Sequence, residues 1–166
     1  MYKNFNNSRP RISPISYALR LIKIRMRSEK ELIDKMTLKK YLASEIDETI
    51  SKLKSAKLID DKIFAEMWLR SQNITKPSGK KLLMLKMKRF GLAKDIVDQA
   101  FEAQEGEFDE ATQAKRIIES KGRFFNKYTG RDRYEKMLAL LLRRGFDYSL
   151  AKEAISKFDS PPGKVS

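Results

Sequence analysis

The residue types that could carry chemistry in this chain are acids and bases, because cysteine and histidine are both absent. Thiolate sites, zinc sites built on cysteine or histidine, and nucleophiles activated by histidine are therefore excluded. Two acidic pairs, Asp60-Asp61 and Asp109-Glu110, could hold Mg²⁺ in principle. Each pair stands where a helix is expected to begin, so capping of free backbone N–H groups explains these carboxylates better. We predict no metal, no cofactor and no enzymatic activity.

Positive charge is the dominant feature of the composition. The chain has 36 Lys and Arg against 22 Asp and Glu, a net charge of +14, which indicates an anionic partner. The segment from Met67 to Lys94 contains no acid, whereas residues 95–110 contain seven acids and no base. A single charged run is often only a solvated helix face. The acid-free block as a whole favours binding to nucleic acid or to an acidic protein surface.

We predict a basic binding surface for an anionic partner in the middle and C-terminal parts of the chain. The phosphate-loop pattern G-x-x-x-x-G-K-[ST] is absent, although Pro77-Ser78-Gly79-Lys80 resembles it superficially. The candidate residues are therefore bases that would contact an anionic partner directly: Arg70, Lys76, Lys80, Lys81, Lys86, Lys88, Arg89, Arg131, Arg133, Lys136, Arg143 and Arg144.

The elements that would position these bases are helices arranged in repeats of about 50 residues. Three turns align, namely Tyr41-Leu42-Ala43, Gly91-Leu92-Ala93 and Gly145-Phe146-Asp147. Bases precede each turn, an apolar helical pattern follows it, and no strand-like alternation occurs. The prediction is an all-α fold of three tandem three-helix, helix-turn-helix-like repeats. The expected parts are a flexible arm (1–13), repeats at 14–58, 59–106 and 107–159, and a tail (160–166).

Local signals predict several helix ends and the roles of the aromatic residues. Ser28 to Glu31 has the pattern of a capping box. Trp68 lies at helical spacing with other apolar residues and is expected in the core. Phe124, Phe125 and Tyr128 lie with two bases in a loop from Gly122 to Gly130. They could stack on nucleic-acid bases or anchor the loop to its own module.

The ordered set of motifs over residues 15–158 resembles the RecX family. Four stretches carry the resemblance: Tyr17-Ala18-Leu19-Arg20-Leu21, Ser28-x-x-Glu31-Leu32-x-x-Lys35-Met36, Leu58-Ile59-Asp60-Asp61-x-x-Phe64-Ala65, and Leu140 to Phe146. The sequence departs from the family at the first repeat's turn, where Tyr41 replaces a glycine. It departs again in the helix after Gly79. The family usually has more arginine there and a glutamate before the central leucine, whereas this chain has Leu82, Met84 and Lys86.

The resemblance implies that the three repeats form an elongated, curved array. It also implies a regulator that lodges in the helical groove of RecA on single-stranded DNA. Such a protein would damp strand exchange, ATP hydrolysis and coprotease activity in recombination, repair and the SOS response. We expect a cytoplasmic monomer without membrane contact, with at most weak, sequence-independent nucleic-acid binding. The alternative is a helix-turn-helix DNA-binding regulator. Acids in the last helices of the first two repeats, Glu45, Asp47 and Glu48 in the first, weaken that alternative.

Overall fold

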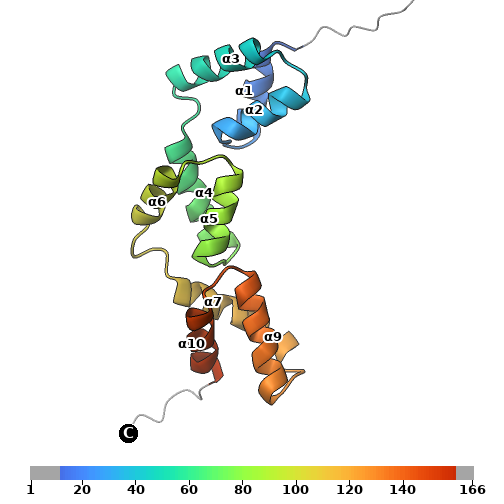
Figure 1. The fold of residues 1–166 in the computed structure, drawn as a ribbon, viewed down its shortest axis with the longest axis vertical. Coiled ribbons are helices and arrows are strands. Elements are labelled where there is room, and N and C mark those ends of the chain that lie inside the picture. The colour runs from blue at the N-terminus through green and yellow to red at the C-terminus, as the bar shows by residue number, and fades with distance from the viewer. Residues whose placement is uncertain (1–11, 160–166) are drawn as a thin grey trace, which may run out of the picture. The chain divides into compact units, whose positions relative to one another are not determined.

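A computed structural model describes residues 12–159, and every regular element in that range is a helix. The predicted all-α class is therefore confirmed. Nearly all of the expected N-terminal arm and the C-terminal tail lie outside the described residues. The helices are α1 (Pro14–Ile24), α2 (Glu29–Leu38), α3 (Ala43–Ser55), α4 (Asp61–Thr75), α5 (Lys80–Arg89), α6 (Lys94–Glu102), α7 (Glu110–Ser120), α8 (Gly122–Phe125), α9 (Gly130–Arg143) and α10 (Tyr148–Asp159) (Figure 1).

The chain divides into two compact units, residues 1–64 and 65–166, with the division inside α4. In the first unit, α1, α2 and α3 pack against one another. The sequence starts α1 with Pro14 in its first turn and with the Ser13 hydroxyl accepting from the Ser16 N–H at 3.3 Å. Apolar residues spaced at three and four positions then form one core, made of Ala18, Leu32, Met36, Tyr41, Ile46, Ile50, Leu53 and Ile59.

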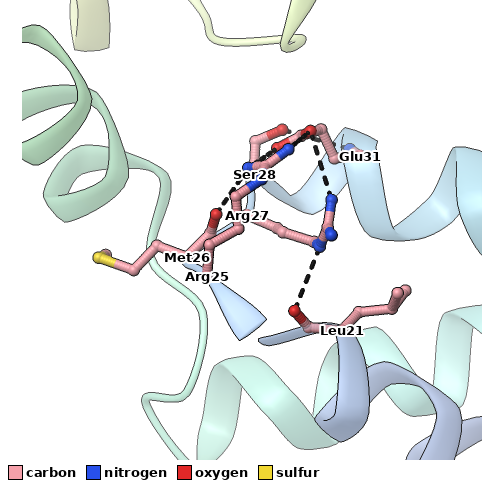
Figure 2. A network of polar contacts seen from close by, with 6 residues as sticks. All are labelled: Leu21, Arg25, Met26, Arg27, Ser28 and Glu31. Carbon is pink, nitrogen blue, oxygen red and sulfur yellow. Dashed lines mark hydrogen bonds and ion pairs between the residues drawn. The ribbon is translucent and has the colours of Figure 1, made fainter. Parts of the chain in front are cut away.

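The turn between α1 and α2 is held by a polar network around Glu31 (Figure 2). The Ser28 hydroxyl accepts from the Glu31 N–H at 3.2 Å, as the capping pattern predicts. The Glu31 carboxylate accepts from the Arg25 guanidinium, with an Nη1–Oε2 distance of 3.0 Å. Arg27 lies 3.7 Å from the same carboxylate, and its Nε donates to the Leu21 carbonyl at 3.3 Å. These contacts tie the end of α1 to the start of α2.

In the second unit, α7, α9 and α10 pack side by side at the C-terminal end (Figure 1). Their buried residues form a separate core: Ala114, Ile117, Ile118, Phe125, Met137, Leu141, Phe146, Ala151 and Ile155. Before them in the chain, α5 contacts α6, and the rings of Trp68 and Phe90 meet edge to face at 5.3 Å. The predicted packing role of Trp68 agrees with this contact. The short helix α8 lies in the segment that the sequence had indicated as a loop.

One helix-ending turn follows each of α2, α5 and α9. A left-handed residue follows each of these three helices, and the next N–H returns to a carbonyl five residues earlier at 3.2–3.3 Å. A turn of the same kind ends α3, where Lys57 is left-handed (φ 54°) and the Leu58 N–H donates to the Leu53 carbonyl at 2.9 Å. Such a turn satisfies the last free carbonyls of a helix. After α2, α5 and α9 the left-handed residues are Lys40 (φ 59°), Gly91 (φ 80°) and Gly145 (φ 86°), and the buried residues that follow them are Tyr41, Leu92 and Phe146.

This geometry corrects the sequence alignment of the first turn by one residue. Lys40, not Tyr41, corresponds to Gly91 and Gly145, and Tyr41 is the buried anchor with 8% of its surface exposed. The turn was misaligned because glycine is the usual marker of a left-handed residue. Lys40 adopts that conformation without the marker. The apparent departure from the family at Tyr41 therefore lies at Lys40.

In each of the two acidic pairs, the two carboxylates cap two different helices. The first acid of each pair caps its own helix: Asp60 accepts from the Lys62 N–H at 2.8 Å, and Asp109 accepts from the Thr112 N–H at 2.9 Å. For the helices we use the names first, middle and last group for α1–α3, α4–α6 and α7–α10. The second acid of each pair caps a helix of the group that precedes it in the chain. Asp61 accepts from the Glu29 N–H of α2 at 2.9 Å, and Glu110 accepts from the Lys80 N–H of α5 at 2.7 Å.

The capping environment shifts the pKa of two of these acids in opposite directions. Burial raises the pKa of the Asp61 carboxyl above its ordinary value, and the hydrogen bond from the Glu29 N–H only partly opposes this. The hydrogen bond from the Thr112 hydroxyl lowers the pKa of Asp109. Capping therefore accounts for both pairs, as the sequence analysis expected.

Within the second unit, α5 begins against the turn that follows α9. The Gly79 N–H donates to the Arg144 carbonyl at 2.9 Å. A side chain at Gly79 would overlap the Gly145 carbonyl, and a side chain at Gly145 would overlap Leu82. Two glycines thus permit a direct backbone contact, and Leu82 is packed beneath it.

Replacing Lys40 by glycine should raise the free energy of unfolding of the first unit by about 0.5–1 kcal/mol. The left-handed conformation costs a residue with a Cβ about 1–2 kcal/mol, and the greater freedom of unfolded glycine offsets part of that gain. Urea unfolding followed by circular dichroism, with amide exchange in α2 and α3, measures the change. Lys39 has right-handed backbone (φ −82°, ψ 2°), so Lys39→Gly should be destabilising. Equal effects of the two substitutions would contradict the assigned turn.

Replacing Gly79 by alanine should destabilise the second unit by about 1–3 kcal/mol, the usual range for overpacking. The added methyl group forces α5 away from Gly145 and breaks the Gly79–Arg144 hydrogen bond. Gly122→Ala is the matched control, because no atom lies within 4 Å of a Cβ at that position. Thermal unfolding of both variants is the measurement. A Gly79→Ala protein as stable as the Gly122→Ala protein would show that the backbones are not in contact.

Candidate binding surface

All twelve predicted surface bases lie in the second unit, and four of them are paired with carboxylates of the chain itself. Arg70 lies 3.7 Å from Glu107, Arg131 lies 2.7 Å from Glu135, and Arg133 lies 3.3 Å from Asp159. Lys81 of α5 pairs with Asp147, which follows α9. Exposed pairs of this kind contribute little to stability, about 0–1 kcal/mol. They nevertheless reduce the positive charge that these four residues present to an anionic partner.

Two other predicted bases lie over aromatic rings. The Lys80 ammonium is 5.0 Å from the centroid of the Phe101 ring, and the Lys136 ammonium is 4.5 Å from that of Tyr128. Both arrangements fall within the range of cation–π attraction. Each lysine keeps its positive charge, but the aromatic ring holds its side chain in one position on the protein surface.

Lys76, Lys86 and Arg144 bring positive charge together from three parts of the second unit. Lys76 follows α4, Lys86 lies in α5 and Arg144 follows α9. The Arg144 guanidinium donates to the Pro77 carbonyl at 3.4 Å, which holds it beside the segment that begins with Lys76. The pKa of Lys86 is lowered, first by its partial burial and then by the positive charges of Lys76 and Arg144. The fold therefore brings together three like charges that are far apart in the sequence.

The last turns of α5 and α9 carry three further bases. Lys88 and Arg89 are exposed at the end of α5, and Arg143 is exposed at the end of α9. Part of their role is local, because cations near a helix C-terminus stabilise it by about 0.3–1 kcal/mol. We use the name cationic cluster for Lys76, Lys86 and Arg144 taken together with these three exposed bases of the same helix ends, Lys88, Arg89 and Arg143.

The structure excludes a phosphate loop at the start of α5. The N–H groups of Gly79 and Lys80, which would have to bind phosphate, already donate to the Arg144 carbonyl and the Glu110 carboxylate. A carboxylate at that place also repels an anion. Among residues 12–159, no group of three or more Asp or Glu side chains is arranged to hold a metal ion. In the same range, no helix is long and apolar enough to cross a membrane.

A polar junction beside the cluster was not predicted from the sequence. The Arg116 guanidinium of α7 donates to the carbonyls of Asn73 and Ile74, at 2.7 and 2.9 Å, near the end of α4. The buried Gln113 donates to the side chain of Asn73, which donates in turn to the Glu107 carbonyl at 3.0 Å. This network closes the end of α4 and thereby fixes the start of the segment that carries Lys76. No local motif could indicate it, because its partners are about forty residues apart.

Comparison with known proteins agrees with this architecture. A family model described as the first three-helix domain of RecX matches residues 15–53. The regulatory protein RecX of Thermotoga maritima is 34% identical over 146 residues, covering 88% of this chain and 84% of that protein. That of Chlorobium phaeobacteroides is 31% identical, covering 84% and 89%. A crystal structure of RecX from Lactobacillus salivarius has a TM-score of 0.73 and 25% identity, covering 88% of this chain and 94% of that one.

The match to a three-helix domain and the common description of the relatives identify the class as a regulatory protein. The relatives are similar over most of both chains, so the similarity is not confined to one domain. The chain belongs to the RecX family.

The pKa of Lys86 provides a test of the cluster in the isolated protein. Titration by NMR after ¹³C methylation of the lysines should place Lys86 below the ordinary lysine value of 10.5. Neighbouring positive charges disfavour the protonated form, so Lys76→Gln should raise the pKa of Lys86. Lys52→Gln, in α3 of the first unit, should leave it unchanged. A Lys86 pKa that does not respond to Lys76→Gln would contradict the convergence of these charges.

Proposed function

We propose that this protein binds the RecA filament on single-stranded DNA and inhibits its recombinase, ATPase and coprotease activities. The observation that carries the proposal is the cationic cluster, which three separate elements build in the second unit. Membership of the RecX family and the sequence resemblance to it support RecA as the target. A surface that gathers like charges at the expense of its own electrostatic energy is suited to an anionic partner, whose binding relieves the repulsion.

Tandem helical groups suit a helical filament, because successive groups can contact successive subunits. Each contact can be weak when it is linked to the next, since the second contact forms at high effective concentration. A protein held in the filament groove would obstruct the second DNA strand and restrain the subunit movements that accompany ATP hydrolysis. Inhibition then requires no catalytic residue in the regulator.

A helix-turn-helix DNA-binding regulator remains the alternative. The third helix of such a unit would enter the major groove, but α3 carries Glu45, Asp47 and Glu48, and α6 carries Asp95 and Asp98. Carboxylates on these helices repel phosphates. Bare DNA binding should accordingly be weak, sensitive to salt and indifferent to sequence. Protection of one defined operator sequence would favour the alternative.

Neutralising Lys86, Lys88 and Arg89 together to glutamine should weaken inhibition of RecA ATP hydrolysis by about 3–150-fold in effective concentration. The estimate assumes roughly 0.2–1 kcal/mol for each lost surface charge contact. Glutamine retains helix propensity and length, and Lys81 is left unchanged because it pairs with Asp147. The matched control neutralises Lys23, Lys39 and Lys62, three exposed lysines of the first unit.

Two measurements distinguish failure of the surface from failure of the target. Co-sedimentation with RecA on single-stranded DNA, with free DNA and free RecA as controls, reports binding. If the triple variant and its control inhibit equally, the cationic cluster is not the contact surface. If the unmodified protein neither binds the filament nor slows ATP hydrolysis, the proposed function is wrong.

A further inference from the structure

The segment between α7 and α9 differs from its counterparts earlier in the chain. The connections from α1 to α2 and from α4 to α5 each span four residues, 25–28 and 76–79. The connection from α7 to α9 spans residues 121–129 and contains the extra turn of helix α8. This added segment carries Phe124, Phe125 and Tyr128.

The two adjacent phenylalanines have opposite environments. Phe125 is buried, with 1% of its surface exposed, and belongs to the core formed by α7, α9 and α10. Phe124 remains 48% exposed. Phe125 therefore anchors the segment, which leaves the exposure of Phe124 without a packing explanation. An exposed aromatic ring of this size is a common feature of recognition surfaces.

Ring contacts hold Phe124 in place despite its exposure. Its centroid lies 5.4 Å from that of Phe125 with an interplanar angle of 69°, and 5.4 Å from that of Tyr128 with an angle of 60°. Tilted and edge-to-face pairs at this distance are favourable by about 0.5–1.5 kcal/mol. A ring that is supported by two neighbours and half exposed is preorganised to receive one more flat group.

The surroundings of Phe124 are positively charged. Lys121, Arg123 and Lys127 are exposed in the same segment, and Lys136 lies over Tyr128. Within the described part of the chain, no carboxylate forms an ion pair with Arg123 or Lys127. The nearby Glu135 pairs instead with Arg131. Phosphate groups beside the ring would therefore meet bases whose charge is available.

We propose that Phe124, supported by Phe125 and Tyr128 and flanked by Arg123 and Lys127, is a stacking platform for an unpaired base of single-stranded nucleic acid. An aromatic ring within a basic surface is the combination that binds single strands without sequence preference. Duplex DNA is not a suitable ligand, because its bases are already stacked on one another. The inference deepens the proposed function by adding a direct contact to the single strand. It is tested without RecA, so the two can fail separately.

The test compares two fluorescein-labelled strands of equal length and charge, oligothymidine and an abasic deoxyribose-phosphate strand, by anisotropy at low salt. The unmodified protein should bind oligothymidine more tightly than the abasic strand. Phe124→Ala should weaken oligothymidine binding by about 5–100-fold, the usual range for one stacked base, and should remove the preference for bases. Phe124→Tyr should retain the preference, because every stacking ring has a flat π face.

Matched variants separate stacking from other effects. Leu142→Ala removes a comparably exposed apolar side chain, 42% exposed, from α9 and should leave binding unchanged. Lys127→Gln should reduce the slope of log affinity against log salt by about 0.7, the value for one phosphate contact to a single strand. Phe124→Ala should not change that slope. Unfolding of Phe124→Ala should show a loss of stability no larger than the two ring contacts explain, about 0.5–1.5 kcal/mol each, so binding is compared where both proteins are folded.

Two results would overturn the platform. One is equal affinity of the unmodified protein for the thymidine and abasic strands. The other is a Phe124→Ala protein that binds oligothymidine normally yet inhibits RecA less well, because Phe124 would then be a contact for protein. A Phe124→Ala protein that loses oligothymidine binding but still inhibits RecA would support the platform and place the inhibitory surface elsewhere.

Discussion

The carboxylate of Asp61 on the first N–H of α2, and that of Glu110 on the first N–H of α5, join consecutive helical groups by the same interaction. A helix N-terminus has free N–H groups and a partial positive charge, so a carboxylate there is stabilised twice. Each of these acids belongs to the first helix of the group that follows. The start of one group thus completes the preceding group, and the positions of α2 and α5 depend on residues that come about thirty positions later.

This use of acids has an electrostatic consequence for the whole chain. Several carboxylates near the second helices are committed to capping or to local pairs, as with Glu110 and with Asp147. These carboxylates are therefore not available to neutralise the exposed bases of a chain whose net charge is +14. Lys76, Lys86 and Arg144 gather where α4, α5 and α9 end, and the pKa of Lys86 is lowered first by its partial burial and then by the charges of the other two. The arrangement favours anion binding at the expense of some stability of the isolated protein.

The sequence predicted features that depend on neighbours within one or two turns of helix. The all-helical class follows from apolar spacing, and the caps at Ser28, Asp60 and Asp109 follow from side chains that reach their own helix. The left-handed turn at Lys40 was missed because lysine carries no signal for it. The ion pairs of Lys81 and Arg133 were missed because their partners lie 66 and 26 residues away. Sequence could therefore name the bases but not divide them into paired and unpaired ones.

The contact between Gly79 and the turn after α9 also bears on how the chain is made. At about 5–20 residues per second on the ribosome, several seconds separate the synthesis of Gly79 from that of Arg144, whose carbonyl accepts the Gly79 N–H. During that interval α5 lacks this partner, and until residue 110 appears it lacks the Glu110 cap as well. The nascent middle group is consequently incomplete, and it reaches its final form only when the last group has emerged and folded against it.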